Sequence, residues 1–108
     1  MQVVLDTTSY FKILSIHGWF PIPYKSRYYP AYRSVNGINQ IFQQTMDSTV
    51  GFPQPNGNYY FSANLGFSYG TDQFGNPTTW NTVIVEILTA PSATTSGIGR
   101  VVSMYPGQ

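Results

Sequence analysis

The sequence predicts an all-β fold, namely an antiparallel β-sandwich or a jelly-roll-like barrel with at most one short helix. Between Tyr59 and Tyr69 every second residue is aromatic or apolar, the pattern of a half-buried strand. Aromatic residues make up 17% of the chain and charged residues only 8%, against about 25% charged in ordinary soluble domains. Segments rich in Pro and Gly separate the apolar stretches, as turns separate strands.

The N-terminal part of the chain contains two candidate strands. Residues 2–5 form a short apolar run, and residues 10–20 are rich in β-branched and aromatic side chains, so both are predicted as strands. Pro21 and Pro23 end the second strand, because proline cannot donate to a ladder. Residues 21–35 then form a long connection with three prolines. A connection of this length in a compact domain is often functional.

The period of the apolar positions changes in residues 36–46. Ile38, Ile41 and Phe42 are spaced as on one face of a helix, and Asn36 is a candidate N-cap. This segment is therefore the one short helix that the sequence predicts. A bent strand is the alternative, because the segment contains Gly and Thr, which are poor helix formers.

The C-terminal half of the chain has the pattern of an antiparallel meander of three strands. An open loop follows the alternating stretch and leads into a long strand at 79–90, and a second loop leads into the last strand at 98–105. Both faces of residues 79–90 are apolar, so this strand is predicted to be central and covered on both sides. Nothing in the sequence marks an internal repeat or boundary, so residues 1–108 are predicted to form a single β domain.

Glu86 is the unusual charge of this half, because it interrupts the apolar run of the long strand. A buried carboxylate needs a partner, and a hairpin that turns near residues 93 and 94 places Arg100 nearly opposite. An ion pair is the first interpretation, and a contact between subunits is the second. The inward side chains of the strands are predicted to form the core: Phe61, Leu65, Phe67, Val83, Val85 and Ile87.

The sequence offers little for catalysis or metal binding. The chain has one histidine (His17), no cysteine and four acidic residues that lie far apart. It shows no pair of carboxylates and no activated nucleophile, and a single histidine without cysteine makes no protein metal site. We therefore expect a protein that is not an enzyme and that holds no metal or cofactor, with His17 as a structural strand residue.

The densest candidate for function is the long connection before the predicted helix. It contains three of the five basic residues and four of the nine tyrosines. Tyrosine supplies flat contact area and a hydroxyl, and arginine adds a planar fork of donors. The alternative is that these tyrosines cover the domain's own surface or a subunit interface. The predicted ligand-binding residues are Tyr24, Lys25, Arg27, Tyr28, Tyr29, Tyr32 and Arg33.

Glycans, anionic polymers and proteins are the ligands that suit such a segment. Single-stranded nucleic acid is an alternative, because stacking on bases and pairing with phosphates use the same side chains. The net charge of +1 makes nucleic acid unlikely as the ligand. No apolar run approaches the length of a membrane span, and we expect no signal peptide, because the N-terminus lacks a basic region followed by an apolar one.

Two short stretches resemble the C1q/TNF-like jelly rolls. Residues 51–67 are similar to the family segment in which a Pro-Gly turn leads into Tyr-Tyr-Phe-Ser and an alternating strand, and residues 101–108 are similar to its strand ending in Leu-x-Pro-Gly-Asp. The resemblance implies a tight homotrimer that binds ligands on loops and subunit faces. The chain departs from the family after this turn, so either residues 2–20 supply the missing strands in permuted order or only the meander is shared.

The composition, the start at Met1 and the segment Tyr-Phe-Lys-Ile-Leu-Ser-Ile also resemble trimeric head domains of bacteriophage tail fibres and receptor-binding proteins. This resemblance implies a homotrimer on the virion surface that recognises a host cell-surface saccharide or protein. The expected function is a non-enzymatic binding or structural module of a viral particle, with a fibre head as the first interpretation. The alternatives are a secreted, C1q/TNF-like extracellular ligand-binding trimer and a capsid decoration or assembly protein.

Overall fold

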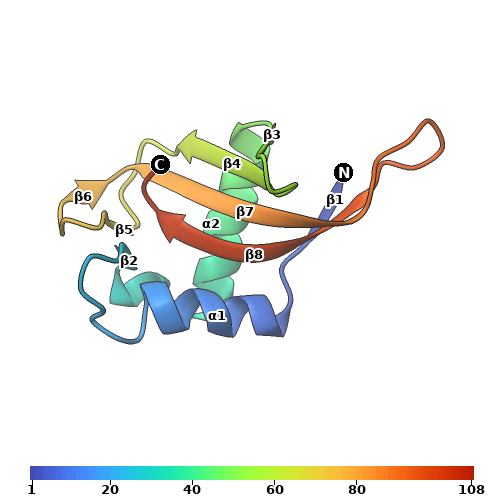
Figure 1. Ribbon diagram of the computed structural model, residues 1–108. Coiled ribbons are helices and arrows are strands. Elements are labelled where there is room, and N and C mark those ends of the chain that lie inside the picture. Colours follow the sequence, from blue (N-terminus) through green and yellow to red (C-terminus); the bar gives the residue numbers. More distant parts are fainter.

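The computed structural model describes residues 1–108 as a mixed α/β structure with two α-helices, one short 3-10 helix and two sheets (Figure 1). The five-stranded sheet has the spatial order β1 (Gln2–Val4), β8 (Ile98–Pro106), β7 (Trp80–Thr89), β4 (Tyr59–Asn64) and β3 (Phe52–Pro53). The three-stranded sheet has the order β2 (Arg27–Tyr28), β5 (Gly70–Thr71) and β6 (Pro77–Thr78). The helices are α1 (Thr7–His17), the short 3-10 helix η1 (Pro30–Tyr32) and α2 (Val35–Ser48). The predicted all-β sandwich or jelly-roll-like barrel is therefore wrong.

The main error of the prediction lies in α1, which occupies the segment expected to be the second strand. Oδ1 of Asp6 caps this helix by accepting a hydrogen bond from the Ser9 amide at 2.8 Å. Gly18 ends it and donates its amide to the carbonyl of Leu14 at 3.1 Å. Ile13 and Leu14 are fully buried beneath the sheet. The weak alternation of this segment thus reflects a helix with one buried face and not a doubly covered strand.

The helix predicted at residues 36–46 is confirmed as the slightly longer α2. Its N-cap is Ser34, whose hydroxyl accepts a hydrogen bond from the Gly37 amide at 3.0 Å, and not Asn36. Gly37 lets the helix begin directly beside η1, because a Cβ atom there would lie 2.7 Å from the Tyr32 carbonyl oxygen. The buried face consists of Ile38, Ile41, Phe42 and Thr45.

The meander predicted for the C-terminal half is confirmed. β4 pairs antiparallel with β7, β7 pairs antiparallel with β8, and β1 adds in parallel to the other edge of β8. β4 ends at Asn64, well before Tyr69, and the chain turns at Gly66, which has a φ of +74°. Phe67 follows this turn and is 56% exposed, so its predicted place in the core is wrong.

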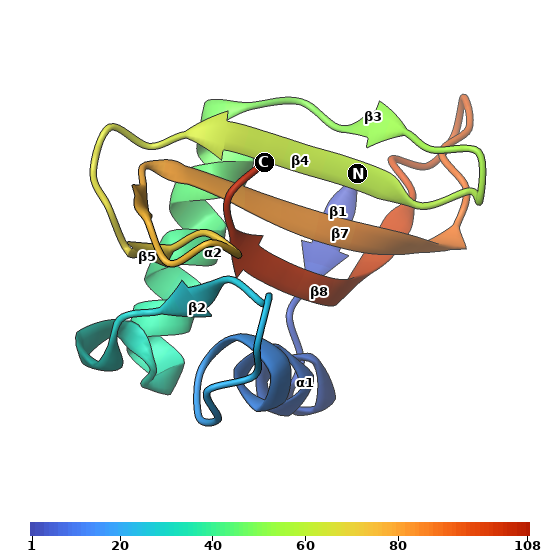
Figure 2. The same cartoon turned by 60° about the vertical axis from the view of Figure 1, so that its left-hand side comes forward.

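The core lies between one face of the five-stranded sheet and the two helices. Its members are Ile13, Leu14, Tyr28, Ile38, Ile41, Phe42, Phe61, Val83, Val85, Val101 and Met104. Of the predicted core residues, Phe61, Val83 and Val85 are buried, whereas Leu65 and Ile87 are only partly buried. No helix covers the opposite face of the sheet (Figure 2). β7 is thus covered on one side, where the sequence predicted two.

The hairpin that joins β7 and β8 extends away from the body of the molecule (Figure 1). Residues 88–96, which we call the β7–β8 arm, are all exposed. A hydrogen bond of 2.9 Å from the Ser92 amide to the Thr95 carbonyl closes its tip. At its base, the Gln2 amide donates to the Gly97 carbonyl at 3.0 Å. The base of the arm is thus anchored to β1, whereas the nine residues of the arm itself are not buried against the body.

Candidate functional site

The small sheet fixes the segment that the sequence predicted as a binding loop. β2 lies within this segment and pairs with β5, so that Arg27 is opposite Thr71. Gly70 permits the pairing, because a Cβ atom there would overlap the carbonyl oxygen of Arg27. Arg27 and Tyr28, in the middle of the predicted binding segment, are therefore held against the body beside the end of α1 and do not belong to a free loop.

Two of the predicted tyrosines serve the fold. Tyr28 is fully buried, and its hydroxyl donates a hydrogen bond to Oδ1 of Asn81. The ring of Tyr32 packs edge-on against Tyr69, with 4.9 Å between the ring centroids. For these two residues the structure matches the alternative interpretation, in which the tyrosines cover the domain itself, and a ligand has no access to Tyr28.

The two arginines of the segment line a cleft of about 320 Å³ together with Tyr29, Pro30 and Thr71. Nε of Arg27 donates to the Gly18 carbonyl, and Nε of Arg33 donates to the Tyr28 carbonyl, each at 2.9 Å. These hydrogen bonds hold both guanidinium groups in place. We call this space the arginine cleft.

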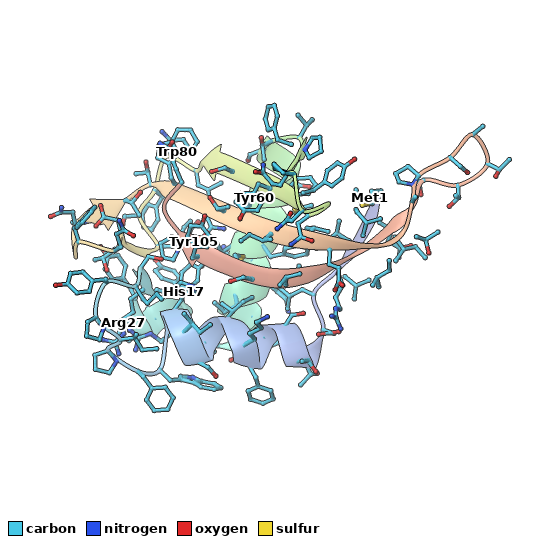
Figure 3. All side chains as sticks on the ribbon, in the orientation of Figure 1. Met1, His17, Arg27, Tyr60, Trp80 and Tyr105 are labelled. Carbon is cyan, nitrogen blue, oxygen red and sulfur yellow. The ribbon has the colours of Figure 1, made fainter.

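The remaining two residues, Tyr24 and Lys25, border a larger cleft of about 600 Å³, a size in the range of small-molecule sites. It lies between the C-terminal half of α1, the turn that joins β5 to β6, and Ser103 and Tyr105 of β8. Six of the polar or aromatic side chains on its wall are Lys12, His17, Tyr24, Lys25, Asp72 and Tyr105. We call this space the histidine cleft. Both His17 and Tyr105 line this cleft, and Figure 3 shows their side chains close together.

The hydrogen bonding of His17 fixes its tautomer. Nδ1 lies 2.8 Å from the carbonyl oxygen of Ser26, and because a carbonyl only accepts, Nδ1 carries the proton. Nε2 has no partner in the chain and can accept a hydrogen bond from a ligand in the cleft. Burial lowers the pKa of His17, and the nearby charge of Lys25 lowers it further, against the opposing effect of the Ser26 hydrogen bond. The imidazole is therefore neutral at pH 7.

Tyr105 and Asp72 are two further polar residues of the histidine cleft. The ring of Tyr105 lies 5.6 Å from that of His17, and burial raises the pKa of its phenol, which stays protonated and can donate to a ligand. Oδ1 of Asp72 accepts hydrogen bonds from the amides of Phe74 and Asn76 and so holds the β5–β6 turn. The cleft thus combines a hydrogen-bond acceptor, a phenol donor and lysine cations.

The basic residues are distributed very unevenly. Lys12 and Lys25 border the histidine cleft, and Arg27 and Arg33 border the arginine cleft, so four of the five cations lie at one end. None of the four forms an ion pair, since the one salt bridge of the chain joins Arg100 to Glu86. Although the net charge of the chain is only +1, these four residues form a localised positive region, which we call the basic end.

Exposed aromatic side chains lie beside the basic end. Trp19, Phe20 and Tyr24 follow α1 and are 41%, 58% and 81% exposed. Tyr24 is the one non-glycine residue with a positive φ, at 60°. Such a conformation is uncommon for a residue with a side chain and tends to mark functional positions. Here the exposed Tyr24 side chain lies at the border of the histidine cleft.

Sequence reasoning missed Lys12, His17 and Tyr105 as parts of the site. The available signal was helical: Asp6 and Ser9 have the spacing of an N-cap pair, and in a helix Lys12 lies one turn before Ile16, which also lines the histidine cleft. Tyr105 comes from a strand far away in sequence, and no local pattern could have placed it there.

Comparisons with the models of known protein families, with curated proteins and with solved structures found no match to this chain. The candidate site therefore depends on its own geometry. No group of three or more His, Asp or Glu side chains lies close enough to hold a metal ion. Neither helix has the length and apolar character needed to cross a lipid bilayer.

Proposed function

We propose that the chain is a non-enzymatic binding module that recognises an acidic saccharide at its basic end. The observation that carries this proposal is the gathering of Lys12, Lys25, Arg27 and Arg33 around two clefts without a single ion pair among them. Uncompensated cations beside clefts of ligand size attract anionic partners.

The side chains around the clefts favour a saccharide within the class of acidic ligands. Sugar rings present apolar faces and hydroxyl groups, and the exposed Tyr24 offers a flat ring at the histidine cleft. The His17 Nε2 acceptor and the Tyr105 phenol donor suit hydroxyl groups. The acidic group of the sugar pairs with the lysine or arginine cations.

The hydrogen bonding of His17 argues against Ser26 as a nucleophile activated by this histidine. Ser26 is the one hydroxyl bonded to this histidine, and its Oγ lies 3.3 Å from Nδ1. Nδ1 already carries a proton that it donates to the Ser26 carbonyl, so it does not act as a base toward that hydroxyl. Asp72, the acidic residue of the cleft, is occupied by the β5–β6 turn.

The setting that we propose is a viral particle, on which the module meets a host cell surface. This part of the proposal is supported by composition: a surface with few charges and many neutral hydrogen-bonding side chains is common among virion proteins. The sheet face that no helix covers (Figure 2) supports this setting, because a subunit of a particle needs surfaces that are free to contact its neighbours.

Binding to a panel of acidic and neutral polysaccharides tests the proposed function. We expect binding to acidic polysaccharides, and weaker binding to their neutral counterparts. Lys25→Ala and Tyr24→Ala should each lower the affinity about fivefold, the loss of roughly 1 kcal/mol of contact. The matched controls are Arg100→Ala, which removes one positive charge elsewhere, and Phe52→Ala, which removes a 64% exposed ring on β3; both should bind normally.

Equal affinity for neutral and acidic polysaccharides, or no binding to either, would overturn the proposal. Single-stranded nucleic acid belongs in the same panel. If nucleic acid binds more tightly than the polysaccharides, with an affinity that falls steeply as the salt concentration is raised, the ligand of the basic end is nucleic acid and not a saccharide.

A second candidate function is a subunit that assembles with further copies of itself, for which the sequence suggested a trimer. The β7–β8 arm favours it, because nine consecutive exposed residues (88–96) project from the body without covering any part of it. Replacing the arm by a short Asn-Gly turn should convert a self-associated protein to monomer in native mass measurements. A wild-type chain that is monomeric at micromolar concentration excludes this candidate.

A further inference from the structure

We propose that the arginine cleft is an oxyanion-binding subsite that takes a carboxylate, sulfate or phosphate group between Arg27 and Arg33. The inference rests on the proposed function, because it assigns the acidic group of the ligand to one place at the basic end. It goes further by naming the two side chains that hold this group and the chemistry that they recognise.

The guanidinium groups of Arg27 and Arg33 are held in place by the backbone of the chain itself. Each uses its Nε–H for one hydrogen bond of 2.9 Å, Arg27 to the Gly18 carbonyl and Arg33 to the Tyr28 carbonyl. The terminal N–H donors of both groups have no acceptor in the chain. They are the donors that form paired hydrogen bonds with the two oxygens of a carboxylate or with two oxygens of a sulfate or phosphate.

No acidic side chain compensates these two charges. The four acidic residues are engaged elsewhere or lie apart: Asp6 caps α1, Asp72 holds the β5–β6 turn, Glu86 pairs with Arg100, and Asp47 lies near the end of α2. Burial, and then the charge of Arg27, lower the pKa of Arg33. Two like charges are thus held near each other, and an anion between them relieves their repulsion.

The shape of the arginine cleft fits a small oxyanion attached to a larger ligand. Its volume of about 320 Å³ exceeds what the anion alone needs, so part of the attached ring can enter. The Thr71 side chain lies on its wall and has no hydrogen bond within the chain, so its hydroxyl can donate to the anion. Tyr29 also lines this cleft.

The backbone around the arginine cleft is held at several points. The Arg33 carbonyl accepts a hydrogen bond of 2.8 Å from the Tyr10 hydroxyl on α1. The Tyr29 amide donates to the Tyr69 carbonyl at 2.9 Å. Both arginines are therefore positioned before a ligand arrives, which reduces the entropy lost on binding.

The Nε–H resonances of the arginines provide a direct test. Their hydrogen bonds to carbonyls slow the exchange of these protons with water, so Arg27 and Arg33 should both be visible in nitrogen-15 NMR spectra. Titration with sodium sulfate, with phosphate and with acetate, at constant ionic strength, should shift both resonances saturably. The backbone amide resonances of Glu86 and Arg100, which lie on the large sheet, serve as the internal control and should shift only slightly.

Variants then establish which residues carry the effect. Arg27→Gln and Arg33→Gln should each weaken sulfate binding about tenfold or more, as expected for the loss of a charge-assisted contact. Arg100→Gln, which removes the same charge from another part of the molecule, should stay within about twofold of the wild type. If Arg33→Gln fails to fold, the sulfate affinity of Arg27→Gln and the shifts of the wild-type resonances still decide whether the arginine cleft binds the anion.

Resonances of Arg27 and Arg33 that do not move, or Gln variants that bind sulfate like the wild type, would overturn the subsite. Its failure is distinguishable from that of the proposed function. A protein that binds acidic polysaccharides through Lys25 and Tyr24 but ignores free oxyanions retains the function and loses the subsite. Comparison of uronate-containing with sulfated polysaccharides then identifies whether the anion comes from a carboxylate or a sulfate ester.

Discussion

The hydroxyl of Tyr28 donates a hydrogen bond to Oδ1 of Asn81, across a separation of 53 residues in the chain. Nδ2 of Asn81 in turn donates to the Thr45 hydroxyl at 2.8 Å, and Thr45 donates to the Ile41 carbonyl at 2.8 Å. This buried chain of hydrogen bonds joins β2, β7 and α2. It explains why a buried polar residue lies near the start of the longest strand, and it ties β2, which carries Arg27 of the arginine cleft, to the core.

Tyr28→Phe should lower the free energy of unfolding by about 1–3 kcal/mol. The ring still fills its place, but the variant leaves Oδ1 of Asn81 without a donor in a site where Asn81 is only 2% exposed. Urea denaturation measures the effect. Tyr29→Phe is the control, because the Tyr29 hydroxyl is only partly buried, and it should cost less than about 0.5 kcal/mol. Equal stabilities of the two variants would contradict the role of the buried network.

The two phenylalanines on either side of the Gly66 turn should differ sharply in their contribution to stability. Phe61→Ala should cost about 3–5 kcal/mol, because Phe61 is 8% exposed and belongs to the core. Phe67→Ala should cost under about 1 kcal/mol, because Phe67 is 56% exposed. Chemical denaturation of both variants checks the comparison, and a large loss for Phe67→Ala would show that this ring is covered in solution.

Glu86 and Arg100 lie opposite each other on β7 and β8, and the distance from Oε2 to Nη2 is 3.0 Å, so the predicted ion pair is confirmed. The side chains are 45% and 44% exposed, contrary to the burial that the apolar run suggested. A double-mutant cycle with Glu86→Gln and Arg100→Gln should give a coupling energy below about 1 kcal/mol that vanishes in high salt. A larger coupling that resists salt would indicate that another subunit covers the pair.

His17 should make the stability of the protein depend on pH. Its pKa in the folded state lies below the ordinary value of 6.5 because of burial, so the unfolded chain binds a proton that the folded chain does not. The free energy of unfolding should therefore fall as the pH decreases below about 6.5, with a slope of at most about 1.4 kcal/mol per pH unit.

Urea denaturation at a series of pH values measures this dependence on His17. The chain has no second histidine, so His17→Gln should abolish the slope between about pH 5 and 6.5. A variant that keeps the slope of the wild type would mean that another group titrates in this range. Lys25→Ala is a useful companion, because the charge of Lys25 contributes to the low pKa of His17 and its removal should make the slope shallower.

Local patterns identified the C-terminal strands and α2, but not the end of β4 at Asn64 or the N-cap of α2 at Ser34. The β4–β7–β8 meander, the Glu86–Arg100 pair and the helix near residues 36–46 all follow from periodicity and turn signals within short windows. The failure at α1 has a physical reason. A short segment rich in Ile, Leu and aromatic residues fits the two-residue period of a strand and the 3.6-residue period of a helix about equally poorly. The local signals that distinguish a helix from a strand here were the N-cap residue Asp6 and the C-terminal Gly18.

The candidate site was predictable only in part. Composition identified the segment with Tyr24, Lys25, Arg27 and Arg33 as unusual, but it could not divide the segment between the two clefts or show that Tyr28 enters the core. That division depends on β2 pairing with β5, which brings Arg27 opposite Thr71 from a distant part of the chain.

The sequence by itself determined the composition of the surface, the three long C-terminal elements and the residues that carry positive charge. Only the tertiary structure decided that helices cover one face of the sheet, that His17 and Tyr105 share a cleft, and that Arg27 and Arg33 face the same space. The reason is that secondary structure responds to neighbours within a few residues. Clefts and charge clusters depend instead on contacts between segments that are far apart, and these are set by the packing of the whole core.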